Sequence, residues 1–266
     1  MKKVLSLLAL FLAFAPNLFA DALPKTEWEI SPEIYHFKYE EPGIMENKGV
    51  MYGLRGSLVS HRWWMFKIEG SYATGKVDYT SNGSGSVDNL DDYTYEGRFL
   101  GGPDFKFKDG KIALTPFFGA AYRYLNDDSA GRVTSTGHRG YERESKYWYG
   151  PLGAELMIEA RGGWSFGASG EYDIFWSGEQ TSHLSGAVAS LNDVKNSQDS
   201  GYGARFSLKA VKKGENFDIL IEPFFRWWKI DESDLANVTY AGVLVGYGYE
   251  PNNKTTEIGA KVGILF

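Results

Sequence analysis

The chain has 266 residues, a formal net charge of −6 and no cysteine. Because an acidic protein is a poor partner for a phosphate backbone, we expect it to bind no nucleic acid. The absence of cysteine excludes both disulfide bonds and thiolate catalysis. A mean hydropathy of −0.33 excludes a bundle of transmembrane helices, whereas the abundance of glycine and aromatic residues fits strands with one apolar face.

The N-terminus has the three parts of a secretory leader. Lys2 and Lys3 precede an apolar run over residues 4–14, and a stretch of small residues ends at Ala20-Asp21-Ala22. The run is shorter than the roughly 18 apolar residues that a membrane-spanning helix needs. We therefore expect residues 1–22 to be a signal peptide, cleaved after Ala20 or Ala22, and residues 23–266 to form one barrel domain.

Apolar and polar residues alternate with a period of two over ten segments, a pattern that indicates strands and not helices. From the N-terminus, the segments cover residues 28–39, 50–58, 64–72, 93–105, 112–124, 148–158, 164–176, 202–210, 217–227 and 258–266. Within the first segment the apolar phase slips between Ile34 and Tyr35. We expect a β-bulge at that point.

The connections between the segments differ in length. Short turns lie at residues 60–62, 108–111, 161–163 and 213–216, and longer polar loops cover residues 41–48, 79–92, 126–146, 178–199 and 231–253. Bacterial outer-membrane barrels have short periplasmic turns and long extracellular loops. The fold class that we predict is therefore all-β: a closed, antiparallel, ten-stranded transmembrane barrel with its short turns in the periplasm and its long loops outside the cell.

We expect the apolar face to point outward into lipid. In a soluble sandwich or lipocalin-like barrel it would point inward, where many Trp and Tyr side chains would need buried hydrogen-bond partners. The aromatic residues of this face lie mostly near the strand ends, as in the girdles of membrane barrels. The alternating C-terminal strand with its final aromatic residue resembles the assembly signal of outer-membrane barrels, carried here by Ile258, Ala260, Val262, Ile264 and Phe266.

The opposite face carries charges of both signs. Charges in a narrow lumen need paired, hydrogen-bonded partners, so we predict a network that fills the barrel. Its predicted members are Arg55, Lys67, Glu69, Glu96, Arg98, Arg123, Glu155, Glu171, Arg205, Glu222, Arg226 and Lys261. Ten strands around such side chains are too few for a general porin, and a narrow substrate-selective channel is one alternative function.

The strand count, the chain length and the terminal Phe266 resemble the omptin fold, the ten-stranded outer-membrane barrels whose best-known members are surface proteases. The resemblance implies an extracellular cleft in which an Asp-x-Asp pair and an Asp-x-His pair activate a water molecule. Neither spacing occurs here, and Thr181 stands two residues before His183. An omptin-like protease is a second alternative, for which the nearest candidate acids are Asp91, Asp92, Asp127 and Asp128.

His183 and Ser185 have the His-x-Ser spacing of small outer-membrane lipid A deacylases, in which histidine activates serine. In a loop rich in glycine and serine, such residues are more often simply solvated. The remaining histidines show no metal-ligand spacing, so we predict neither a metal site nor a cofactor. The acids near Asp88 and Asp91 offer oxygen ligands to a divalent cation, but a solvated acidic loop accounts for them as well.

We interpret the chain as a non-enzymatic barrel of the bacterial outer membrane with a structural or surface-recognition role. The expected partners are outer-membrane lipid and lipopolysaccharide, together with the barrel-assembly machinery, which would bind the C-terminal strand. The sequence does not identify an extracellular ligand. Residues 238–249 are apolar and aromatic, and we expect them to form an exposed patch above the membrane.

Overall fold

The structure is a computed structural model that describes residues 25–266. The expected signal peptide, residues 1–22, lies outside the described residues. Within the described range, no helix is long and apolar enough to cross a membrane. The helical segments are two short pieces between strands, the 3-10 turn η1 (Arg161–Gly163) and α2 (Leu184–Ala187).

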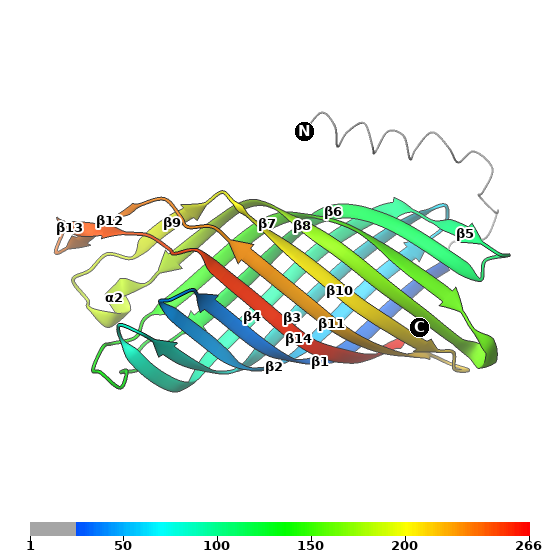
Figure 1. Cartoon of the computed structure of the whole chain (residues 1–266), viewed down its shortest axis with the longest axis horizontal. Coiled ribbons are helices and arrows are strands. Elements are labelled where there is room, and N and C mark those ends of the chain that lie inside the picture. The colour runs from blue at the N-terminus through cyan, green and yellow to red at the C-terminus, as the bar shows by residue number, and fades with distance from the viewer. Residues whose placement is uncertain (1–24) are drawn as a thin grey trace, which may run out of the picture.

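One antiparallel sheet closes on itself to form the barrel (Figure 1). The strands of residues 25–266 occupy ten positions around the barrel, and we call each position a stave. β4 and β5 share one stave because β5 continues β4 along β6, and β9 and β10 share another because they lie end to end beside β8. Pairing of β1 with β14 joins the first stave to the last. The predicted ten-stranded antiparallel barrel is confirmed. Its strands are β1 (Lys25–Glu41), β2 (Met45–His61), β3 (Trp64–Ser81), β4 (Gly85–Pro103), β5 (Phe105–Phe107), β6 (Ile112–Asp128), β7 (Glu142–Glu159), β8 (Trp164–Ser182), β9 (Val194–Gln198), β10 (Gly201–Lys212), β11 (Asp218–Ile230) and β14 (Asn253–Leu265).

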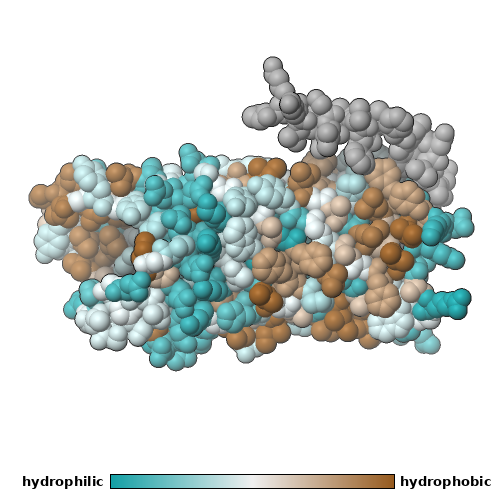
Figure 2. All heavy atoms as spheres, in the orientation of Figure 1, coloured by the Kyte–Doolittle hydropathy of each residue, from teal (hydrophilic) through white to brown (hydrophobic). Residues whose placement is uncertain are grey.

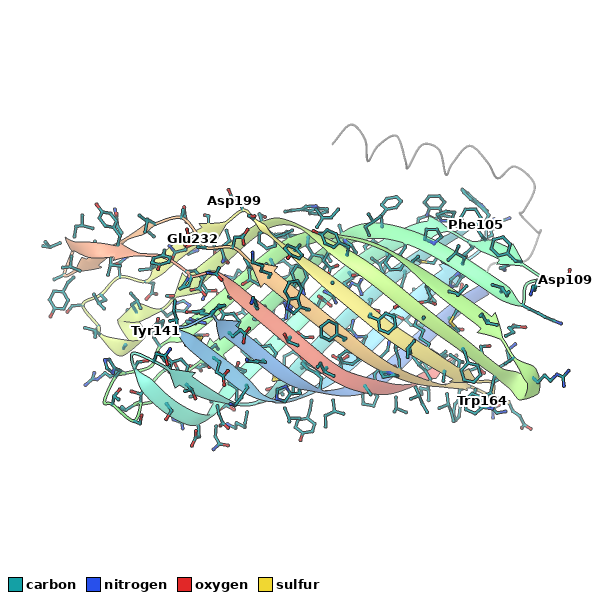
Figure 3. All side chains as sticks on the ribbon, in the orientation of Figure 1. Phe105, Asp109, Tyr141, Trp164, Asp199 and Glu232 are labelled. Atoms are coloured by element: carbon teal, nitrogen blue, oxygen red, sulfur yellow. The ribbon has the colours of Figure 1, made fainter. Side chains whose placement is uncertain are left out.

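The two ends of the barrel differ, and we call them the turn end and the loop end. At the turn end the connections are short and the C-terminus lies beside β1, where Phe266 exchanges two backbone hydrogen bonds with Trp28. Figure 3 shows Phe105 and Trp164 near this end, and Tyr141, Asp199 and Glu232 toward the loop end. At the loop end a separate hairpin, β12 (Ala236–Tyr240) and β13 (Val243–Gly248), projects farthest from the barrel (Figure 1).

Two of the predicted long loops, residues 41–48 and 79–92, are wrong. β1 continues to Glu41 and β2 begins at Met45, so residues 42–44 alone connect them. In the same way, residues 82–84 connect β3 to β4. The polar residues that suggested loops belong to strand ends whose outer face is polar.

The predicted bulge after Ile34 is also wrong. β1 pairs with β2 without a break from Lys25 opposite His61 to Glu41 opposite Met45. The side chains keep strict alternation, but the inward positions change from Glu29, Ser31 and Glu33 to Tyr35, Phe37 and Tyr39. The phase slip in the sequence therefore marks a change of the barrel interior and not an extra residue.

The outer surface is divided into zones along the barrel axis (Figure 2). An apolar band surrounds the half near the turn end, with exposed side chains such as Ile30, Ile68, Phe99, Ile221 and Val262. A charged belt follows toward the loop end, where exterior ion pairs join neighbouring positions. These pairs are Lys38–Glu40, Lys48–Glu46, Lys76–Asp91, Lys146–Glu144, Lys195–Glu179 and Lys229–Asp231.

The interior has the opposite order. Behind the apolar band it is mainly charged, with a small hydrophobic cluster at Met65, Leu100 and Phe117. Behind the charged belt it holds the main hydrophobic core, which includes Phe37, Met51, Val77, Leu90 and Trp228. We call these two parts of the barrel the band half and the protruding half. β1 and β2 exchange the chemistry of their two faces between the halves without a break in alternation, whereas the register shifts by one residue in β4 opposite Val77 and in β8 opposite Trp148.

Candidate functional site

A central network of charged side chains fills the lumen of the band half. Arg205 donates to Glu96 through both terminal nitrogens, at 2.9 and 2.6 Å, and to Asp173 through Nε at 2.7 Å. Arg98 joins Glu69 at 2.9 Å and also bonds Glu171. Because β4 is not a neighbour of β8 or β10 in the sheet, the Arg205–Glu96 and Arg98–Glu171 pairs cross the lumen.

The same network continues around the wall. Arg55 lies 2.6 Å from Glu69 and 3.3 Å from Glu33, and Arg226 bridges Glu33 and Glu257 at 2.8 and 3.0 Å. All twelve side chains that the sequence assigned to the lumen lie inside the barrel. The sequence did not predict Glu33 as a lumen residue, because the expected bulge left open which residues of β1 point inward.

Toward the turn end, a second set of ion pairs surrounds a water-accessible vestibule. Lys261 contacts Glu29 at 2.5 Å and Glu222 at 3.2 Å, and Lys209 bonds Glu155. Cavities of about 150 and 290 Å³ adjoin these residues. The barrel is thus open from the turn end as far as the central network.

An aromatic layer covers the other side of the central network. The rings of Tyr149 and Trp228 meet edge to face at 4.8 Å, and both are almost fully buried. Arg205 lies over both rings, and Tyr149 donates a 2.7 Å hydrogen bond to Glu96. Charged groups and aromatic rings therefore interlock across the lumen, and two small cavities of about 20 and 10 Å³ lie on the far side.

The four candidate acids do not form one site. Asp91 points outward and pairs with Lys76, and Asp128 is also exposed. Asp92 and Asp127 point inward from β4 and β6, directly opposite each other in the register. Burial, reinforced by the charge of Asp127, raises the pKa of Asp92 to about 9. A protonated acid at neutral pH is a poor general base.

His183 and Ser185 share a partner and do not contact each other as base and nucleophile. The Nδ1 atom of His183 lies 3.0 Å from Asp193, and the Ser185 hydroxyl donates to the other carboxylate oxygen of Asp193 at 2.7 Å. Burial lowers the pKa of His183, but the bond to Asp193 outweighs it and raises the pKa overall. In a serine hydrolase the histidine faces the serine. This geometry does not supply that contact.

The remaining predicted positions are placed as follows. Ile258, Ala260, Val262, Ile264 and Phe266 lie on the outer face of β14. In the described range, no group of three or more His, Cys, Asp or Glu side chains is arranged to hold a metal ion.

Residues 238–249 fall on the β12–β13 hairpin. Its turn residues Ala241 and Gly242 both have positive φ angles, as a tight hairpin turn requires. Asn192 ties β12 to the loop that contains α2 through its side chain and backbone. The tip residues Val243 and Val245 are 67% and 59% exposed. The hairpin is therefore an ordered apolar projection, held on its β12 side.

The fold defines the class of protein as a closed, ten-stranded antiparallel barrel with the omptin-like architecture. No family model matches the sequence, and no curated protein matches it. The outer-membrane protease OmpT of Escherichia coli aligns in structure over 91% of this chain and 96% of its own, with a TM-score of 0.58 and 9% sequence identity. At that identity the likeness concerns the fold alone.

Two other solved barrels align less well. Ail, the attachment invasion locus protein of Yersinia pestis, covers 91% of this chain and 99% of its own, with 13% identity and a TM-score of 0.33. The toluene transporter TodX of Pseudomonas putida covers 96% of this chain and 90% of its own, with 11% identity and a TM-score of 0.35. These alignments are too loose to support an argument.

Proposed function

We propose that this chain is a non-conducting barrel of the bacterial outer membrane that presents its protruding half as a recognition surface. The observation that carries the proposal is the exchange of chemistry between the two halves. In the band half, an apolar outer surface around a charged interior is suited to a surrounding lipid bilayer. In the protruding half, a charged outer surface around an apolar core is suited to surrounding water. The shared fold with an outer-membrane protease supports the same location.

The orientation follows from the same division. The turn end faces the periplasm, and the protruding half extends from the cell. The charged belt then meets the head groups of the outer leaflet, where its lysines would contact lipopolysaccharide phosphates. The outer face of β14, with the terminal Phe266, would be the segment that the barrel-assembly machinery binds.

Location is tested by fractionation of cells that express the full chain. We expect the protein in the outer-membrane fraction, with a folded form that migrates faster than the heated form in electrophoresis. Recovery in the soluble periplasmic fraction without detergent would contradict the proposal.

The closed lumen is tested by conductance in planar bilayers. The purified protein should show no stable open-channel steps, because the central network and the aromatic layer cross the lumen. The triple variant Glu96→Ser, Asp173→Ser and Arg205→Ser removes the hub of the network together with both acids that Arg205 bonds, and should conduct more. Conductance by this variant also serves as a positive control, because it shows that the measurement detects protein inserted in the bilayer. Large, stable conductance steps in bilayers that contain the unaltered chain would contradict a closed lumen.

Recognition through the hairpin is tested with two probes, purified lipopolysaccharide and phosphatidylcholine vesicles. We expect the chain in nanodiscs to retain at least one probe, since apolar side chains project on the hairpin tip. The variant Val243→Ser with Val245→Ser should reduce retention. The matched control is Lys213→Ser at the turn end, which should bind as the unaltered chain does. Equal retention of all three proteins would exclude the hairpin as the contact surface.

A further inference from the structure

The protruding half contains a small cavity inside its hydrophobic core, into which a few polar side chains point. Its volume is about 20 Å³, enough for a single water molecule or ion, since roughly 10–15 Å³ suffices for one water. Phe37, Met51 and Leu125 form apolar parts of its lining. The polar lining includes Asn47, Asp92, Asp127 and Arg143. We call these four the mouth cluster together with Glu41 and Glu250, two acids that act on Arg143.

Three oxygen atoms of the mouth cluster are buried without a hydrogen-bond partner among the described residues. They are Oδ1 of Asp92, Oδ1 of Asp127 and Oδ1 of Asn47. Asp92 is only 4% exposed, and it lines the cavity directly opposite Asp127. Asn47 donates from its nitrogen to Asp127 at 2.8 Å, which holds its amide close to that carboxylate. Buried oxygens without partners are costly, and here all three are acceptors.

The mouth cluster is short of positive charge. Its acids are Glu41, Asp92, Asp127 and Glu250, and Arg143 is the cation that acts on Asp92, Asp127 and Glu250. Arg143 bonds Glu41 at 2.7 Å and lies 3.5 Å from Asp127. Its guanidinium also lies over the ring of Tyr39, and no hydrogen bond joins it to Asp92 among the described residues. In the central network, by contrast, each carboxylate meets an arginine or a lysine.

We propose that the cavity binds one calcium ion, held by carboxylate oxygens of Asp92 and Asp127 and by the amide oxygen of Asn47. Calcium takes six to eight oxygen ligands, often a mixture of carboxylates, amide carbonyls and waters in flexible geometry. The two carboxylates, both ionised once the ion is bound, balance its charge, and bidentate carboxylate contacts let these three side chains supply most of the ligands in a space with little room for water. The ion would cross-link β2, β4 and β6 at the loop end. This site does not depend on what the outer surface recognises.

The test measures binding of ⁴⁵Ca²⁺ by flow dialysis to the full chain, refolded in detergent and stripped with a chelator, at pH 8. We expect one ion per chain with a dissociation constant of about 0.1–1 mM, as in extracellular calcium modules. Asp92→Asn and Asp127→Asn should each weaken binding at least tenfold. Asp91→Asn and Asp128→Asn are matched controls, since each alters the outward neighbour of a proposed ligand, and they should bind as the unaltered chain does.

Folding of every variant is checked by its β-sheet circular dichroism and by its mobility before and after heating. If Asp92→Asn does not fold, Asn47→Ala tests the same cavity without changing its charge. Absence of saturable calcium binding by the unaltered chain would overturn the site. Equal binding by the variants of the inward acids (Asp92, Asp127) and of the outward acids (Asp91, Asp128) would also overturn it, because calcium would then bind the charged belt or the detergent only. Competition by magnesium at equal concentration would overturn the assignment to calcium.

Discussion

The band half and the protruding half are built from the same strands and solve opposite problems. In the band half the charged face is enclosed, so its stability depends on ion pairs such as Arg205 with Glu96. In the protruding half the enclosed face is aromatic and aliphatic, and residues such as Val77 and Leu90 are fully buried. Strand alternation fixes only that the two faces differ. The solvent outside decides which face is apolar.

The comparison also indicates where each half tolerates change. The charged side chains in the band-half lumen compensate one another, so removal of one partner leaves the others as buried charges without a counter-charge. The protruding half behaves like the core of a soluble protein, where the loss of volume is the main cost. Substitutions with the same chemistry should therefore have different effects in the two halves.

The largest effect is expected inside the band half. Arg205→Met leaves Glu96 and Asp173 without their shared partner and should cost about 3–5 kcal/mol of unfolding free energy, the range for a broken buried pair. Urea titration in lipid vesicles measures this change. Adding Glu96→Gln to the same chain should recover part of the loss. A cost below 1 kcal/mol for the single variant would mean that the network is solvated and not paired.

The outer surface gives the next largest contrast. Ile68→Arg places a charge within the apolar band on β3 and should cost about 2–4 kcal/mol in vesicles, as for a lipid-facing arginine near the bilayer midplane. Thr80→Arg lies on the same strand and the same face, in the protruding half, and should change stability by less than about 0.5 kcal/mol. Equal costs for the two variants would remove the distinction between the halves.

Much of this arrangement follows from the sequence. The ten staves and the inward positions of Glu69, Arg98 and Glu171 come directly from period-two alternation. The apolar residues Met65, Leu100 and Phe117 of the band half also point inward, so alternation alone does not fix the chemistry of the inner face. The same rule misled at residues 35–39, where aromatic side chains are inward. An apolar residue was assumed to be outward, and that assumption holds only where lipid surrounds the barrel.

The candidate site was less predictable. Asp91 and Asp92 are neighbours in sequence and lie on opposite sides of the wall, which becomes clear only once β4 is known to extend through this segment. Asp193 lies ten residues from His183, and the short turn at α2 brings them together. Periodicity carries no information about such a contact, because it depends on how an irregular loop folds.

The pH dependence of stability separates the mouth cluster from an ordinary surface acid. Burial raises the pKa of Asp92 from 3.8 to about 9, and the charged groups that act on it are Asp127, Arg143, Asp128 and Asp91. A raised carboxyl pKa means that the folded state binds more protons, so its contribution to stability falls as the pH rises between about 4 and 9. With calcium removed by a chelator, the Asp92→Asn variant should lose much of this decrease in unfolding free energy with rising pH.

The control for this measurement is Asp91→Asn, whose pH profile should match that of the unaltered chain because Asp91 is exposed beside Lys76. Urea unfolding midpoints at pH 6 and pH 9 are sufficient. Calcium should restore stability at pH 9 in the unaltered chain and not in Asp92→Asn. An unchanged slope in Asp92→Asn would show that Asp92 is solvated in the folded barrel.

The smallest effect is expected at the charged belt. The Lys76–Asp91 pair is largely exposed, and such pairs contribute roughly 0–1 kcal/mol because water and salt screen them. Lys76→Ala should therefore change the unfolding free energy by less than about 0.5 kcal/mol, and high salt should abolish even that change. The same measurement on Lys261→Ala, which leaves Glu29 and Glu222 unpaired inside the band half, should show a loss several times larger and less sensitive to salt. If the two lysines behaved alike, the belt and the lumen would share one dielectric environment, and the exchange of chemistry between the two halves would have no energetic meaning.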